Sequence, residues 1–149
     1  MTTDPEPAEL ADHAAIRAVL AHYMRAMRLR DVDLMDAVFT ADATIDYTAI
    51  GGSKASWADT KGWLQGMIDV ELFMLFVGDV YPIFAADRQT ADVESTWHGV
   101  FVGSAGAPPL IIFGTYADRF VRTPDGWRIS ARTDQPALQI PAPAAADLS

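Results

Sequence analysis

The sequence predicts an α+β fold in which three N-terminal helices pack on a strongly curved antiparallel β-sheet. The clearest signal runs from Gly114 to Asp134, where two segments of alternating apolar residues are joined by Thr123-Pro124-Asp125-Gly126. Proline presets φ and glycine accepts a positive φ, so this tetrapeptide predicts the turn of a β-hairpin. Upstream, apolar residues recur first at helical and then at strand spacing. The predicted order is helix, helix, strand, helix and then four strands.

The N-terminal half carries the predicted helices. A long amphipathic helix is expected from Ala8 to Leu29, because its apolar residues share one face: Ile16, Leu20, Tyr23, Met24 and Met27. Asp31-Val32-Asp33 interrupts it, and a shorter helix over 34–39 follows. Ser56 and Asp59 resemble a capping box, which predicts a third helix that reaches about Asp69.

Alternating or β-branched runs predict the strands. They cover Ala43 to Tyr47, Leu72 to Tyr81, Thr90 to Val102 and the hairpin, with Pro82 ending or bulging the second of them. The last strand has two possible phases. One places Arg128, Ser130, Arg132 and Asp134 on the concave side, and the other, shifted by one residue, places Trp127, Ile129 and Ala131 there.

Length and composition indicate a single domain over 9–136, with loose tails at 1–8 and 137–149. The chain has no cysteine, which excludes disulfides, thiolate catalysis and cysteine-bound metals. Its formal charge of -9 would repel phosphate backbones, so nucleic acid is not an expected partner. No secretion signal or long apolar run is present, and we expect a cytoplasmic protein that does not enter membranes.

The hairpin contains Gly114-x-Tyr116-x-Asp118-Arg119-Phe120 and Gly126-Trp127-Arg128-Ile129, and upstream stand Tyr23-x-Arg25-Ala26 and Asp46-Tyr47. These short motifs resemble the SnoaL-like branch of the NTF2-like superfamily, which includes scytalone dehydratase and bile-acid dehydratases. The resemblance covers residues 10 to 135. It implies an NTF2-like cone of helices on a bent sheet, and a homodimer formed through that sheet.

The resemblance also implies a site in which tyrosines lie over the substrate and a histidine with an acidic partner moves protons. Tyr23 and Tyr47 match the tyrosines. The sequence departs from the pattern at two positions, since Arg28 stands where the first-helix acid is expected and Leu75 or Phe76 stands where the histidine is expected.

A cone of this kind would enclose an aromatic-rich cavity suited to a flat hydrophobic ligand. The residues predicted to contact the substrate are Met27, Trp63, Leu75, Trp97, Phe101 and Tyr116. Alternatively, the same side chains simply fill the core.

Three polar residues are candidates to replace the histidine as catalytic groups beside the two tyrosines. Asp134 could act as base and Arg132 as an electrostatic clamp at the cone's mouth, or the two could form an ion pair on a solvated strand. His98 is a candidate general base because histidine is the side chain most often used for proton transfer, although its alternation with Glu94 and Thr96 favours the outer face.

The predicted function is a cofactor-independent lyase or isomerase of the dehydratase or cyclase type. It would transfer protons on a small aromatic, polyketide-like or steroid-like substrate. One alternative is a non-catalytic ligand-binding or accessory domain. Another is an epoxide hydrolase, which would need an Asp-Arg-Asp constellation of which Arg132 and Asp134 supply part. No metal-ligand spacing stands out, so neither metal nor cofactor is expected.

Overall fold

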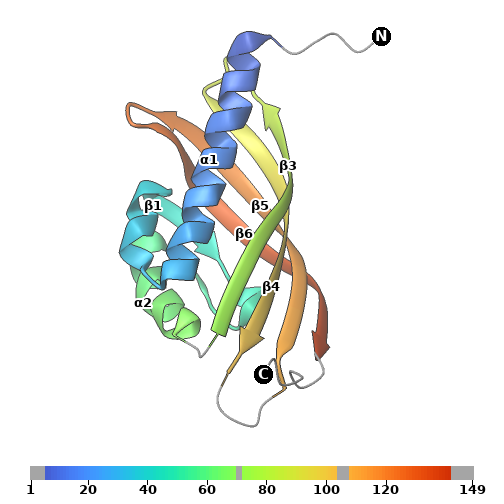
Figure 1. The fold of residues 1–149 in the computed structure, drawn as a ribbon. Helices are drawn as coiled ribbons and strands as arrows, with labels where there is room; N and C mark the ends of the chain where they lie inside the picture. Colours follow the sequence, from blue (N-terminus) through green and yellow to red (C-terminus); the bar gives the residue numbers. More distant parts are fainter. Residues whose placement is uncertain (1–5, 70–71, 104–107, 142–149) are drawn as a thin grey trace.

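In the computed structural model, which describes residues 6–69, 72–103 and 108–141, helices cover one face of a single curved sheet (Figure 1). The strands are ordered β2-β1-β6-β5-β4-β3, and neighbours are antiparallel except for the parallel pair of β1 and β6. The elements are α1 (Pro7–Leu29), the 3₁₀ helix η1 (Val32–Ala37), β1 (Phe39–Asp46), the 3₁₀ helix η2 (Thr48–Ile50), β2 (Lys54–Ser56), α2 (Trp57–Ile68), β3 (Leu72–Phe84), β4 (Thr90–Val102), β5 (Leu110–Thr123) and β6 (Gly126–Pro141). The predicted α+β class is confirmed.

The prediction of three helices on an antiparallel sheet is confirmed only in part, since one strand pair is parallel. Among the described residues there are two α-helices, and the predicted second helix is the six-residue η1. Asp31 caps η1 by accepting a hydrogen bond from the backbone N–H of Asp33 at 3.1 Å. Because β1 already begins at Phe39, the segment has room only for a short 3₁₀ helix.

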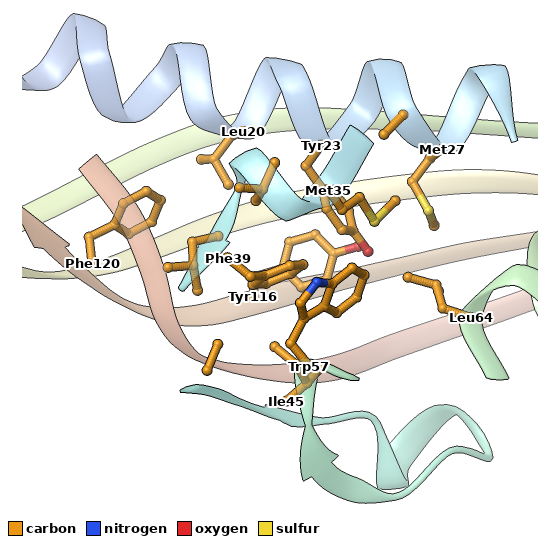
Figure 2. Packing of buried hydrophobic residues seen from close by; sticks show 14 of the residues in the cluster. Leu20, Tyr23, Met27, Met35, Phe39, Ile45, Trp57, Leu64, Tyr116 and Phe120 are labelled. Carbon is orange, nitrogen blue, oxygen red and sulfur yellow. The ribbon is translucent and has the colours of Figure 1, made fainter. Parts of the chain in front are cut away.

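The two α-helices follow their sequence signals. Ile16, Leu20, Tyr23 and Met27 of α1 are all buried against the sheet. Figure 2 shows Tyr23 and Met27 projecting from α1 into the core, with Leu64 of α2 near Met27. Ser56 caps α2 by accepting from the backbone N–H of Asp59 at 3.2 Å, as the capping-box pattern predicts.

The hairpin of β5 and β6 forms where the sequence places it, with Gly126 at a φ of 105°. It also contains a β-bulge. Arg119 pairs with Ala131 and Phe120 pairs with Ile129, so Ser130 is an extra residue in β6. The bulge changes the phase of the strand. Before the bulge in the chain the buried residues are Trp127 and Ile129, and after it they are Arg132 and Asp134.

Neither predicted phase of β6 therefore holds along its whole length. Arg128 and Ser130 do not share the buried side with Arg132 and Asp134, and Trp127 and Ile129 do not lie behind it. A single inserted residue reverses the alternation, because side chains in a strand repeat every two residues.

Two strands, β1 and β5, begin earlier than predicted, and two others extend beyond their predicted C-terminal ends. β3 continues through Pro82 to Phe84, which an edge strand allows because its outer side needs no N–H donors. Its irregularity lies between Val77 and Val80 instead. β6 pairs with β5 as far as Pro141, so residues 137–141 are strand where a tail was predicted. Residues 7 and 8 begin α1, while the tail residues 1–5 and 142–149 lie outside the described residues.

A polar cluster around the buried Asp12 joins α1 to the sheet near the helix N-terminus. The Asp12 carboxylate accepts hydrogen bonds from Arg88, from Arg122 at 2.9 Å and from the Trp127 indole at 3.0 Å. Burial alone would raise the pKa of Asp12, but these three donors outweigh it and the pKa is lowered. None of the described helices combines the length and apolarity needed to cross a membrane.

Candidate functional site

A small cavity lies between the C-terminal half of α1, α2 and the buried face of the sheet. Its volume is about 50 Å³, enough for roughly three water molecules. Among the described residues, the wall is apolar except for three tyrosines and one tryptophan with polar tips and one carboxylate. It is formed by Tyr23, Met27, Tyr47, Ile50, Leu64, Met67, Leu75, Trp97, Phe101, Ile112, Tyr116 and Asp134.

Two tyrosine hydroxyls meet in this wall. Tyr23 comes from α1, and Tyr47 follows the end of β1, so the pair joins segments 24 residues apart. Their oxygens lie 2.9 Å apart in a hydrogen bond, and both side chains are buried. Burial raises the pKa of each well above its usual value, so both hydroxyls stay protonated at neutral pH. The pair can therefore supply a hydrogen-bond donor to an oxygen in the cavity.

Asp134 is the one acidic residue among the described residues of the wall. Its carboxylate accepts a hydrogen bond from the Trp97 indole at 3.0 Å, and only 3% of the residue is exposed. Burial raises its pKa to about 7, against the lowering effects of the Arg132 charge and the Trp97 hydrogen bond. Gly114 makes room for this indole, because a Cβ at Gly114 would lie 2.8 Å from Trp97 Cε2. An acid with a pKa near neutrality can both take up and release a proton.

Arg132 lies behind the tyrosines and not at the mouth, where the sequence analysis placed it. Its guanidinium donates two hydrogen bonds of 2.7 Å to Asp118 on β5, and both side chains are fully buried. Its Cζ lies 3.9 Å from the ring centroid of Tyr116 and 4.4 Å from that of Tyr23. Neither Arg132 nor Asp118 belongs to the cavity wall, so Arg132 acts on the site only through its charge and the rings that it contacts.

The structure places most of the predicted substrate-contacting residues in the wall. Met27, Leu75, Trp97, Phe101 and Tyr116 line it, whereas Trp63 packs on the Tyr47 ring with centroids 5.7 Å apart.

His98 is corrected. It is exposed on the other face of the sheet, stacked on Phe76 and Phe113 at centroid distances of 4.9 and 5.8 Å. Strand alternation from the buried Trp97 sends its side chain away from the cavity.

Sequence reasoning did not identify Asp118 as the partner of Arg132. Its alternation with the buried Tyr116 and Phe120 on β5 was a usable signal, because three residues spaced by two share a face. The wall residues Ile50, Leu64, Met67 and Ile112 were also not singled out as site residues. Across the described ranges, no three His, Asp or Glu side chains gather closely enough to hold a metal ion.

A bent sheet covered by helices on one face, with the cavity between them, is the architecture of NTF2-like proteins. The chain belongs to the SnoaL-like domain family, which it matches over residues 8–133. It is 33% identical over 134 residues to the uncharacterized protein Rv2910c of Mycobacterium tuberculosis, covering 89% of this chain and 90% of that protein.

Two solved structures illustrate the shared fold. A candidate scytalone dehydratase from Novosphingobium aromaticivorans superposes with a TM-score of 0.79 at 18% identity, covering 93% of this chain and 92% of that one. The hexachlorocyclohexane dehydrochlorinase LinA-type3 from Novosphingobium barchaimii has a TM-score of 0.80 at 13% identity, covering 95% and 97%. At these identities the likeness concerns the fold alone.

Proposed function

We propose that the protein is a lyase or isomerase that moves protons with Asp134 and the Tyr23–Tyr47 pair. The observation behind this is that a carboxylate with a pKa near 7 shares the wall of one small cavity with two protonated tyrosine hydroxyls. An enzyme needs its base near the operating pH and a donor for the oxygen on which charge develops. The names of two structural neighbours, a dehydratase and a dehydrochlorinase, denote eliminations, which begin with the same kind of proton removal.

The proposed reaction starts when the Asp134 carboxylate takes a proton from a carbon next to a carbonyl. The electron pair of that C–H bond moves to the carbonyl oxygen, which accepts a hydrogen bond from the tyrosine pair. The Asp134 carboxylic acid then returns the proton, either to another carbon, which gives an isomer, or to a leaving hydroxyl, which gives an alkene and water. Each route restores the Asp134 carboxylate.

The cavity volume restricts the substrate. About 50 Å³ admits the reacting group alone, whereas sites for whole drug-sized ligands measure about 300 to 1,000 Å³. A polyketide-like or steroid-like substrate would therefore place only its reacting end between Tyr23 and Asp134. The rest of the substrate molecule would lie outside the cavity.

The two alternative functions have less support. Epoxide hydrolysis needs two acids around an arginine that reach the substrate. Asp118, Arg132 and Asp134 complete such a row, but only Asp134 lines the cavity. A purely ligand-binding domain has no use for a buried carboxylate, which costs stability at neutral pH unless it is paired.

Removing the Tyr47 hydroxyl tests the role of the tyrosine pair. Native mass spectrometry of the purified protein would first identify a bound ligand, whose turnover is then measured. We expect Tyr47→Phe to lower kcat about 100-fold, as for other losses of a hydrogen bond to a developing oxyanion. Tyr81→Phe is the matched control, since Tyr81 is 68% exposed on β3. Unchanged turnover in Tyr47→Phe would remove Tyr47 from the mechanism.

We also propose that the protein is a homodimer formed through the uncovered face of the sheet. This face exposes apolar side chains on three strands, namely Phe76, Phe113, Leu138 and Ile140, and His98 lies between Phe76 and Phe113. Burial of such a patch favours association. Light scattering after gel filtration should give twice the chain mass for the native protein and a monomer for Phe113→Glu. A monomeric native protein at micromolar concentration would contradict this proposal.

A further inference from the structure

We propose that the groove between α1 and β3 binds an anionic group, a carboxylate or a phosphate, of the molecule whose reacting part occupies the cavity. The groove has a volume of about 270 Å³. Its walls carry Met24, Arg25 and Arg28 from α1 and Met74, Leu75 and Phe76 from β3. The inference uses the proposed function only to say which end of the molecule reacts.

Arg25 and Arg28 are unusual among the basic side chains of this acidic protein. Both are exposed, and within the described residues neither forms a hydrogen bond or an ion pair. Most other basic side chains are neutralised by carboxylates: Lys61, Arg88, Arg119, Arg122, Arg128 and Arg132. The groove therefore presents two free guanidiniums one helical turn apart in a chain of formal charge -9.

The groove adjoins the cavity. Leu75 contributes to the walls of both, so one side chain stands between the groove and the space next to Tyr23 and Asp134. Cavity and groove together reach the lower end of the size range of small-molecule sites, which neither does alone. Their lining also fits one molecule, because the cavity wall is largely apolar and the two guanidiniums belong to the groove and not to the cavity.

The guanidiniums identify the chemistry of the part of the molecule that lies in the groove. Arginine presents N–H donors in a planar fork that matches the oxygens of carboxylate and phosphate. A neutral polar group would leave both charges without a counterion. The substrate class is therefore an apolar molecule with a small reactive carbonyl or hydroxyl end and an acidic group at the other end.

Three probes with the same six-carbon chain test the inference: hexanoate, hexyl phosphate and 1-hexanol. Isothermal titration calorimetry on the native protein should show at least one of the anions binding about tenfold more tightly than the alcohol, and the stronger anion identifies the acidic group. In Arg25→Gln/Arg28→Gln the affinity for that anion should fall about tenfold, while the affinity for hexanol changes less than twofold. Both substitutions are on the surface, and circular dichroism verifies the fold.

Arg17→Gln is the matched control, because Arg17 is exposed on the same helix and is not part of the groove. The inference is overturned if neither anion binds saturably to the native protein, if hexanol binds as tightly as both anions, or if Arg17→Gln weakens anion binding as much as the double variant does.

A parallel measurement separates this inference from the proposed function. Asp134→Asn alters the cavity and leaves the groove intact, so it should keep the anion preference while losing turnover. Lost turnover in Asp134→Asn without any anion preference in the native protein would sink the groove proposal alone. Anion preference with normal turnover in Asp134→Asn would sink the proposed function alone.

Discussion

Asp134→Asn is expected to lower turnover of the natural substrate about 1,000-fold while leaving the fold intact. Positioned acid–base groups contribute about 10² to 10⁴ to enzymatic rates, and within the part of the chain that the structure describes Asp134 is the one carboxylate in the cavity wall. Asparagine keeps the shape and can still accept the hydrogen bond from Trp97. Asp79→Asn is the matched control, because Asp79 is exposed on β3. Turnover within tenfold of the native value in Asp134→Asn would contradict the proposed mechanism.

The same residue should set the pH dependence of the rate. As a base, Asp134 must be ionised, and its pKa is about 7 because burial disfavours the charged form. We therefore expect kcat/KM to rise tenfold per pH unit below about pH 7 and to level off above it. A profile that is flat between pH 5 and 9 would exclude Asp134 as the base.

Asp134 should also make the protein less stable as the pH rises. Its pKa is about 7 in the folded chain and 3.8 without burial. Between these values the folded chain binds a proton that the unfolded chain has lost, so the free energy of unfolding falls with increasing pH. The expected fall is on the order of 4 kcal/mol by pH 7. Asp134→Asn should not show this fall in the free energy of unfolding, which urea denaturation measures. At pH 8 the variant should therefore be more stable than the native protein.

Asp118→Asn is expected to lower the free energy of unfolding by about 3 to 5 kcal/mol. Asp118 accepts both hydrogen bonds of the Arg132 guanidinium, and neither side chain is exposed. Without the carboxylate, a buried cation would remain unpaired in an apolar core. Urea denaturation at pH 7 measures the loss.

The double variant Asp118→Asn/Arg132→Met provides the control for that loss. Replacing a buried ion pair by apolar or neutral groups of similar size costs far less than breaking it, so the double variant should recover most of the stability. Asp118→Asn alone should also shift the pH–rate profile to lower pH. The reason is that the unpaired Arg132 charge would favour the ionised form of Asp134 and so lower its pKa. If Asp118→Asn lowers the free energy of unfolding by less than about 1 kcal/mol, groups other than Asp118 stabilise the buried Arg132 charge.

Local signals in the sequence predicted most elements of the fold. The Pro124-Asp125-Gly126 turn, the Ser56 cap and the apolar spacing of α1 each depend on neighbours within a few residues, and all three are present. The 3₁₀ form of η1 was missed because its length is limited by where β1 starts, which depends on pairing with β6.

By itself, the sequence predicted that Tyr23 lies on the apolar face of its helix and that Trp97 and Tyr116 lie on the inner faces of their strands, because helical and strand periodicity are properties of consecutive residues. Only the tertiary structure decided that Asp134 joins them and that Arg132 pairs with Asp118. The bulge at Ser130 reverses the alternation of β6 at that point, and a bulge is selected by the packing of Trp127 and Ile129 on one side and the Asp118 ion pair on the other. The position of the acid in the cavity thus depends on interactions between distant segments, which no local pattern encodes.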